Sequence, residues 1–276
     1  MNLVAQGPAV TAAQAQALAR FAGSSTLIQI GPHAWRIRKA KASDEIAPYC
    51  DTAHIDFGFM PEGRRFADLR LLAMDMDSTL ITIECIDELG DMAGRKGEIA
   101  AITAQAMRGE LDYPQSLRKR VALLKGLPEA ALARVYEERL RLTPGAEQLI
   151  SACKKHGVKL LLVSGGFTFF TDRLRARLGL DYTISNVLME RDGKLTGELG
   201  GEIVDAGAKA AKLRAVMGEL GAARDQTVAI GDGANDLKMM ALAGVSVAFH
   251  AKPVVRGQAT CAIDWCGLDA VLNLYE

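Results

Sequence analysis

Three short apolar runs, each ending abruptly at a polar residue, constrain the fold of this chain more than any other feature. Continuous apolar runs of four residues are typical of strands buried on both faces of a parallel sheet. The carboxyl ends of such strands lie at one edge of the sheet, so we expect the polar residues to converge there. The runs and the residues that follow them are 71–74 and Asp75, 160–163 and Ser164, and 228–231 (closed by a glycine) and Asp232.

The sequence from residue 69 onward therefore predicts an α/β domain, a Rossmann-like parallel sheet with helices on both faces. A helical insertion at about 84–141 follows the first strand. Its first segment carries an apolar stripe that includes Cys85, Ile86 and Leu89. Because the insertion begins only a few residues after Asp75, we expect it to fold over the strand ends as a cap.

Residues 1–68 have a different pattern and predict a small α+β module. The expected order is β-α-β-β-α-β, with residues 61–65 as a linker. Thr11 is the expected N-cap of the first helix. We therefore predict two domains, 1–68 and 69–276. The strands are expected at 1–6, 25–30, 35–38 and 53–59, and the helices at 11–22 and 42–50.

The charge balance and cysteine usage bound the possible partners and location. Lys and Arg total 33, Asp and Glu total 33, and the pI is near 6.9. Zero net charge argues against a general nucleic-acid or membrane-surface binder.

No apolar run is long enough to span a bilayer, and the first residues do not resemble a signal peptide. Five scattered cysteines without a C-x-x-C pair are typical of reduced thiols, which predicts a cytoplasmic protein.

The strongest chemical signal is Asp75-Met76-Asp77-Ser78-Thr79, directly after the first apolar run. Two carboxylates at the end of a buried strand are costly unless a cation compensates them, and Mg2+ is the usual choice where phosphates are handled. One carboxylate can attack phosphorus while the other acts as general acid and then base. An Asp-rich turn that only caps a helix is the simpler alternative.

A second acidic motif, Gly231-Asp232-Gly233-Ala234-Asn235-Asp236, follows the third run. Its carboxylates would repel those of the first motif unless a cation lay between them. A metal site therefore explains both motifs, although a capped strand-to-helix turn explains the second one equally well on its own.

Two further features gain weight only beside these carboxylates. Ser164 is followed by Gly165 and Gly166 ahead of a predicted helix, where a hydroxyl and backbone N–H groups can hold a phosphate. Alone, this pattern is more often a simple turn. Lys209 lies near a predicted helix start, where a lysine is usually solvated, but a phosphate among carboxylates needs a fixed cation.

Other catalytic patterns are absent. No lysine is followed by Ser or Thr, which excludes a Walker A motif, and there is no G-x-S-x-G elbow at Ser164 and no H-E-x-x-H. The basic run 118–120 lies on a predicted helix among acidic segments. It predicts a solvated face, or one residue that reaches a carboxylated substrate.

The ordered set D-x-D-S-T, S-G-G, lysine and G-D-G-x-N-D, with a helical insertion after the first motif, resembles the phosphatases of the haloacid dehalogenase-like (HAD) hydrolase superfamily. Each motif alone is moderately specific, and the ordered set is highly specific. The resemblance extends from about residue 69 to the C-terminus. The segments that carry it most closely are 75–90, 109–128 and 227–237.

The resemblance implies an aspartyl-phosphate mechanism. Asp75 would be the nucleophile and Asp77 the general acid and base. Mg2+ would be held by Asp75, by the backbone carbonyl of Asp77 and by Asp232, with Asp236 in support. The phosphoryl group would be bound by Ser164 and Lys209.

The resemblance also implies the substrate, O-phospho-L-serine, hydrolysed to L-serine and phosphate as the last step of serine biosynthesis. In the cap, Glu84 would receive the ammonium group and Arg120 the carboxylate. Gly165 and Asn235 would be secondary contacts. Tyr113 stands where the family pattern predicts Phe.

Three alternatives remain open at this stage. The first two are enzymes of the same family, a phosphotransferase or a phosphatase for another small phosphomonoester. The third is a non-catalytic regulatory protein, and the intact carboxylate set argues against it.

Many family members carry a ligand-binding ACT domain ahead of the catalytic one. Residues 1–68 are compatible with an ACT-like regulatory role, with formation of a homodimer or with packing alone.

Overall fold

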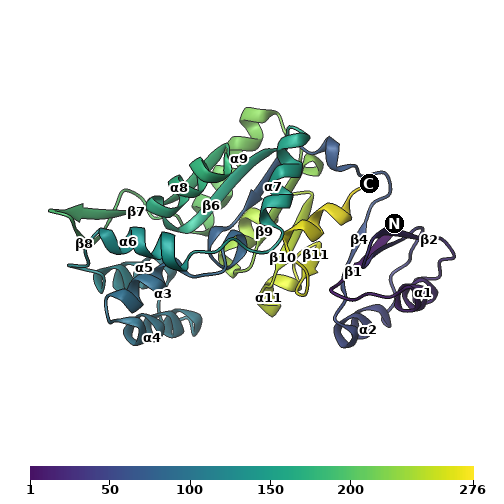
Figure 1. Cartoon of the computed structure of the whole chain (residues 1–276), viewed down its shortest axis with the longest axis horizontal. Coiled ribbons are helices and arrows are strands. Elements are labelled where there is room, and N and C mark those ends of the chain that lie inside the picture. Colours follow the sequence, from purple (N-terminus) through teal and green to yellow (C-terminus); the bar gives the residue numbers. More distant parts are fainter.

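A single sheet of eleven strands runs through the molecule, in the order β2-β3-β1-β4-β11-β10-β9-β5-β6-β7-β8 (Figure 1). The computed structural model describes residues 1–276. The strands are β1 (Asn2–Gln6), β2 (Leu27–Gly31), β3 (Ala34–Ile37), β4 (Asp56–Met60), β5 (Leu71–Met74), β6 (Lys159–Phe167), β7 (Tyr182–Arg191), β8 (Lys194–Gly200), β9 (Thr227–Gly231), β10 (Val245–Phe249) and β11 (Cys261–Ile263).

Eleven α-helices accompany the sheet, and none of them is long and apolar enough to cross a membrane. They are α1 (Ala12–Phe21), α2 (Ile46–Ala53), α3 (Cys85–Met92), α4 (Lys96–Met107), α5 (Tyr113–Ala122), α6 (Ala130–Arg134), α7 (Ala146–Lys155), α8 (Thr168–Leu178), α9 (Ala206–Leu220), α10 (Leu237–Met240) and α11 (Pro253–Arg256).

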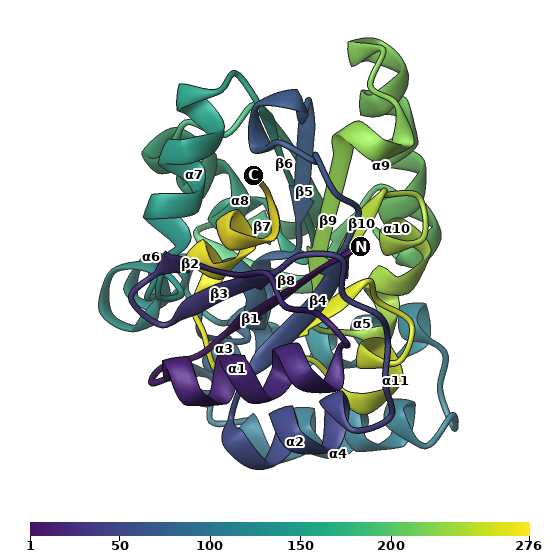
Figure 2. The same ribbon diagram turned by 90° about the vertical axis from the view of Figure 1, so that its right-hand side faces the viewer.

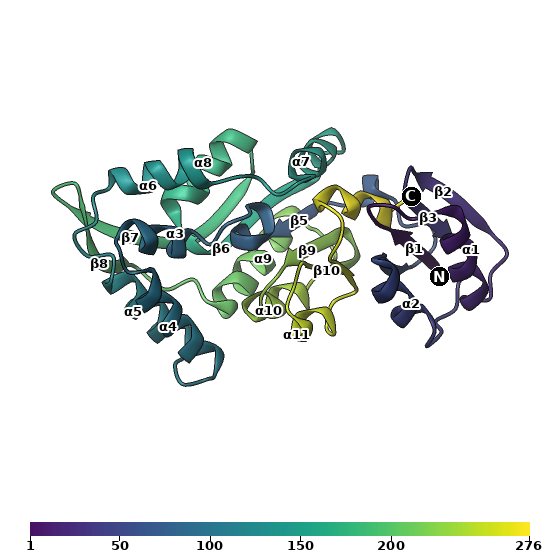
Figure 3. The same cartoon turned by 60° about the horizontal axis from the view of Figure 1, so that its bottom comes forward.

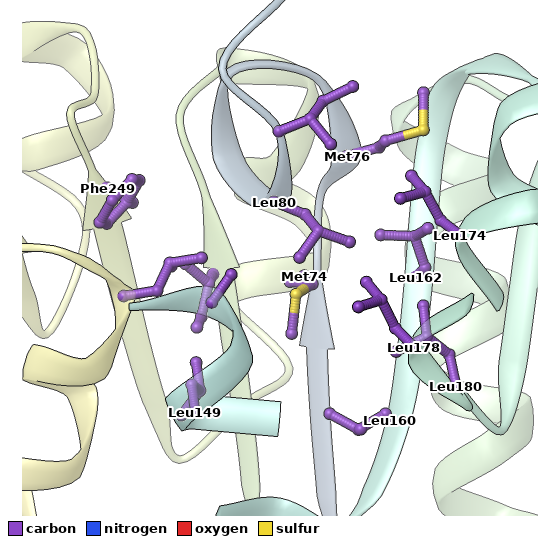
Figure 4. Close-up of a cluster of buried hydrophobic side chains, with 14 of the residues drawn as sticks. Met74, Met76, Leu80, Leu149, Leu160, Leu162, Leu174, Leu178, Leu180 and Phe249 are labelled. Atoms are coloured by element: carbon purple, nitrogen blue, oxygen red, sulfur yellow. The ribbon is translucent and has the colours of Figure 1, made fainter. Parts of the chain in front are cut away.

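The central strands, β11 to β7 in sheet order, are parallel, and β5, β9 and β10 are buried on both faces. Side chains alternate between the faces. Leu72 and Met74 of β5 join a core with residues of α7 and α8 (Figure 4). Leu71 and Ala73 join a second core with residues of α9 and α10. The predicted parallel α/β sheet is confirmed, and the three apolar runs are its adjacent strands β6, β5 and β9.

The insertion after β5 folds as helices α3 to α6, which lie beyond one end of the central strands (Figures 1 and 3). The hairpin of β7 and β8, which the sequence analysis did not predict, extends from the sheet to these helices. Backbone hydrogen bonds join Gly126 to Leu195, Leu195 to Leu127, and Glu129 to Gly193. The hairpin thus fixes the cap from the side opposite its chain connections.

Residues 1–60 form an antiparallel four-stranded part of the same sheet, with α1 and α2 on one face (Figure 2). The predicted order β-α-β-β-α-β is confirmed, as is the Thr11 cap of α1. Helix α2 begins four residues later than predicted. Pro48 then lies in its first turn, where the missing N–H costs little, instead of in the helix interior. The division of the chain at residue 68 remains a prediction.

Asp56, at the start of β4, fastens this N-terminal region to the rest of the sheet. Only one residue pair, Gly58 with Cys261, joins β4 to β11. The Asp56 carboxylate is buried and accepts backbone N–H groups of Asp264 (2.7 Å), Trp265 (3.2 Å) and Cys266 (2.9 Å). A carboxylate that accepts several N–H groups is a strong anchor.

Replacing Asp56 by Ala is therefore expected to lower the free energy of unfolding by about 3 kcal/mol, because three part-buried N–H groups lose their acceptor. Urea denaturation measures this change. Asp51→Ala is the matched control, since its only ion pair, with Arg256 at 3.4 Å, is exposed and should contribute about 0.5 kcal/mol. Equal effects of the two substitutions would contradict the anchoring role.

Candidate active site

The polar residues that follow β5, β6 and β9 meet at one edge of the sheet, as expected. The Asp75 N–H donates to the carbonyl of Ile230 at 3.0 Å, which places the end of β5 beside that of β9. A cavity of about 520 Å3 opens at this edge. Residues of the core line one side of it, and residues of α3, α4 and α5 line the other. The cap and the strand ends therefore enclose one site.

A buried lysine links two carboxylates at the base of the site. Lys209 Nζ lies 2.8 Å from Asp75 Oδ1 and 2.8 Å from Asp236 Oδ1, and all three side chains are buried. Burial alone would lower the pKa of Lys209, but Asp236 and Asp75 outweigh it and raise the pKa. Lys209 is thus a fixed cation. Asp205 caps α9 by accepting the Ala208 N–H at 2.8 Å, and so sets the helix turn that carries Lys209.

The acidic cluster of Asp75, Asp232 and Asp236 has the composition and spacing of a metal site. One carboxylate oxygen from each lies within 4.8 Å of the others. Burial, with Asp236 next, raises the pKa of Asp75. Burial, Asp236 and Glu84 raise that of Asp232 to about 6. One lysine leaves this cluster with excess negative charge, so a hard cation that prefers oxygen ligands fits these residues.

Asp77 lies above Asp75 in a position suited to proton transfer. Its Oδ1 accepts the Cys85 N–H at 2.9 Å, and its Oδ2 lies 3.4 Å from Ser164 Oγ. Burial and the neighbouring Glu84 raise its pKa to about 7, against the lowering effect of the Cys85 N–H. A carboxyl group with a pKa near neutrality can serve as both acid and base.

The Ser164-Gly165-Gly166 segment forms the end of β6, and α8 begins only at Thr168. The helix predicted after these glycines is therefore present, with Phe167 between Gly166 and its first residue. The register between β6 and β7 breaks after Val163, which lets the segment turn toward the site. The Gly166 N–H donates to Ser164 Oγ at 2.8 Å, and the Ser164 hydroxyl donates to Asp77 Oδ2 at 3.4 Å.

Close contacts explain why both positions are glycine. A Cβ atom at Gly166 would lie 2.7 Å from Asp77 Oδ2, and one at Gly165 would lie 2.3 Å from the Tyr113 hydroxyl oxygen. The Gly165 carbonyl accepts Asn186 Nδ2 at 2.8 Å and the Tyr113 hydroxyl at 3.2 Å. Tyr113 starts α5, so this hydrogen bond joins the cap directly to the core.

The cap contributes charges of both signs to the cavity. Glu84 and Arg120 both line it. Ser78 Oγ donates to Glu84 Oε1 at 2.6 Å, which orients the carboxylate. Arg120 Nε is buried without any hydrogen-bond partner. An unsatisfied guanidinium N–H beside a cavity is a donor held ready for a ligand.

The structure brings all the predicted site residues to one place. Ser164, Lys209 and Asp236 are fully buried and contact the lining residues, and the others line the cavity itself: Asp75, Asp77, Glu84, Arg120, Gly165, Asp232 and Asn235.

Sequence reasoning missed several neighbours of these residues. The Asp205 cap had a readable signal, an aspartate directly before a helix start, whereas Asn186 lies within a strand and belongs to no motif. Ser116 and Lys252 also line the cavity.

Comparisons with known proteins agree with this geometry. Residues 72–241 match the family described as haloacid dehalogenase-like hydrolase. A phosphoserine phosphatase of Polaromonas sp. is 58% identical over 217 residues, which cover 77% of this chain and 92% of that protein.

Two solved structures are also similar. An unliganded probable phosphoserine phosphatase from Vibrio cholerae has a TM-score of 0.86 at 37% identity, over 99% of this chain and 86% of that one. A phosphoserine phosphatase solved as a phospho-aspartyl intermediate analogue has a TM-score of 0.71 at 40% identity, over 75% of this chain and 99% of that one.

The Tyr113 hydroxyl is expected to hold the start of α5 against the core. Burial raises its pKa to about 12, so it remains a donor to Gly165. Tyr113→Phe should raise the KM for the substrate about fivefold, a change in binding free energy that corresponds to the loss of one weak hydrogen bond. The melting temperature should not fall. Steady-state kinetics and thermal unfolding measure these effects. Tyr136→Phe, a cap tyrosine without a side-chain hydrogen bond, is the control. An unchanged KM in Tyr113→Phe would contradict this role.

Proposed function

The chain belongs to the haloacid dehalogenase-like hydrolase family, and from this premise we propose that it hydrolyses O-phospho-L-serine to L-serine and phosphate. The observation that carries the proposal is a single cavity with two parts. Asp75, Asp77 and Lys209 form a phosphoryl-transfer group at its base, and Glu84 and Arg120 lie on its cap side. A phosphorylated amino acid presents the matching groups: a phosphate, an ammonium and a carboxylate.

The first half of the reaction transfers the phosphoryl group to the protein. A carboxylate oxygen of Asp75 attacks phosphorus, and the bond between phosphorus and the serine oxygen breaks. The protonated Asp77 carboxyl, with its pKa near 7, gives its proton to the departing serine oxygen. The products of this half are free serine, an aspartyl-phosphate and an ionised Asp77.

The second half restores the protein. Asp77, now ionised, takes a proton from a water molecule that attacks phosphorus, and the bond from phosphorus to Asp75 breaks. Phosphate leaves, and Asp77 is protonated again. Lys209 Nζ, fixed between Asp75 and Asp236, and the Ser164 hydroxyl hold the phosphoryl oxygens throughout.

We propose Mg2+ as the cofactor, because small hard cations prefer carboxylate oxygens and phosphate. Asp75, Asp232 and the backbone carbonyl of Asp77 would hold it, with Asp236 in support. Bound there, it would neutralise the negative charge that the phosphoryl oxygens bring to the acidic cluster.

The cap recognises the amino-acid part of the substrate. Glu84, oriented by Ser78, pairs with the ammonium, and Arg120 binds the carboxylate. Gly165 and Asn235 add secondary contacts beside the phosphate.

We also propose a cytoplasmic location. It is consistent with five free cysteines, four of them buried, and no disulfide. We retain the division into residues 1–68 and 69–276 as a proposal.

A phosphate-release assay over small phosphomonoesters tests the proposed function. With Mg2+ present, O-phospho-L-serine should have the highest kcat/KM, above O-phosphoethanolamine and glycerol phosphate, and chelation of the metal should abolish turnover. Added alcohols should not capture the phosphoryl group. A faster reaction with another ester, or phosphate transfer to an alcohol, would instead favour a different phosphatase or a phosphotransferase of the same family.

Asp75→Asn should lower kcat by at least about 1,000-fold, because an amide cannot act as the nucleophile. Asn has nearly the same shape, and Lys209 keeps its contact with Asp236, so the circular dichroism spectrum should not change. Asp172→Asn, on an exposed part of α8, serves as the control. Near-normal activity of the Asp75 variant would refute the aspartyl-phosphate mechanism.

A further inference from the structure

Two donors on the cavity side of α5 lack any hydrogen-bond partner. They are Ser116 Oγ and Arg120 Nε, and both atoms are buried. Their residues lie four positions apart in one helix, which makes their side chains neighbours on one face. Both residues line the active-site cavity. Two adjacent unsatisfied donors beside one cavity indicate a ligand with two adjacent acceptor atoms.

The free state of the Ser116 hydroxyl is unusual. A serine inside a helix commonly donates to the carbonyl four residues earlier. Here that carbonyl, of Asp112, accepts the Ser116 backbone N–H, and no hydrogen bond of the Ser116 hydroxyl is present. The residue is only 1% exposed, so bulk solvent scarcely reaches it. Such a group is costly unless a ligand satisfies it.

A second hydroxyl in the same cap shows the ordinary behaviour. Thr103 of α4 also lines the cavity, but its Oγ1 donates to the carbonyl of Ile99 at 3.1 Å. The difference between Ser116 and Thr103 therefore lies in hydrogen bonding and not in location.

We infer that Ser116 binds the substrate carboxylate together with Arg120. One carboxylate oxygen accepts the Ser116 hydroxyl, and the other accepts the Arg120 guanidinium. This inference rests on the proposed function and makes Ser116 a determinant of specificity for amino-acid phosphates. Phosphomonoesters that lack the carboxylate would leave both donors unsatisfied and would bind more weakly.

The test compares two substrates that differ in the carboxylate. O-phospho-L-serine carries it, whereas O-phosphoethanolamine has the same phosphate and ammonium without it. Ser116→Ala should raise KM for O-phospho-L-serine about tenfold, with kcat within twofold. The affinity for O-phosphoethanolamine, measured as a substrate or as a competitive inhibitor, should change less than twofold. Ser116→Thr, which keeps the hydroxyl, should restore most of the affinity.

Arg120→Ala should show the same substrate dependence with a larger change, because it removes the charge. Thr103→Val is the matched control and should affect the two compounds equally. An equal effect of Ser116→Ala on both compounds, or no effect on either, would overturn the inference. Failure of the wild-type chain to hydrolyse O-phospho-L-serine would instead overturn the proposed function and the inference with it, so the two failures are distinguishable.

Discussion

The contact of one buried ammonium with two buried carboxylates is the interaction on which the site depends. Lys209 joins Asp75, at the end of β5, to Asp236, which follows β9. Each charge would be too costly to bury alone, and removal of one partner from such a group typically costs about 3–5 kcal/mol. The sheet brings the two carboxylates together, and the positive charge of the lysine offsets the repulsion between them. The charge that it leaves uncompensated is what makes the site receptive to a cation and able to receive a phosphate.

Much of this site could be predicted from the sequence because parallel strands put their carboxyl ends at one edge. The apolar runs specified β5 and β9 closely, so Asp75 and Asp232 had to converge. Ser164 was placed correctly for the same reason, although β6 continues past it to Phe167. Local patterning is informative wherever a strand is buried on both faces, since such a strand is written as a short, continuous apolar run.

Other features depend on contacts between distant segments and could not be predicted in this way. Helix α4 has no clear apolar stripe, because only Ile99 is buried along it. Few residues of the hairpin of β7 and β8 are fully buried, and its pairing with residues 126–129 has no local signal. Asn186 is a strand residue whose role arises from its two partners, the Gly165 carbonyl and the Val204 N–H. Such residues become recognisable only when the chain is folded.

The cap is constrained from two sides, and this explains how a helical insertion can select a substrate. Where the chain leaves and re-enters the core, Thr82 bonds to Arg141 and Thr143 bonds to Leu80. On the other side, the hairpin holds residues 126–129 just after α5. Helix α5 is thereby positioned over the strand ends, so the donors on its cavity face stand at a defined height above Asp75. The residues of the core would carry out the phosphoryl transfer. The position of α5 would determine which phosphomonoester fits the cavity.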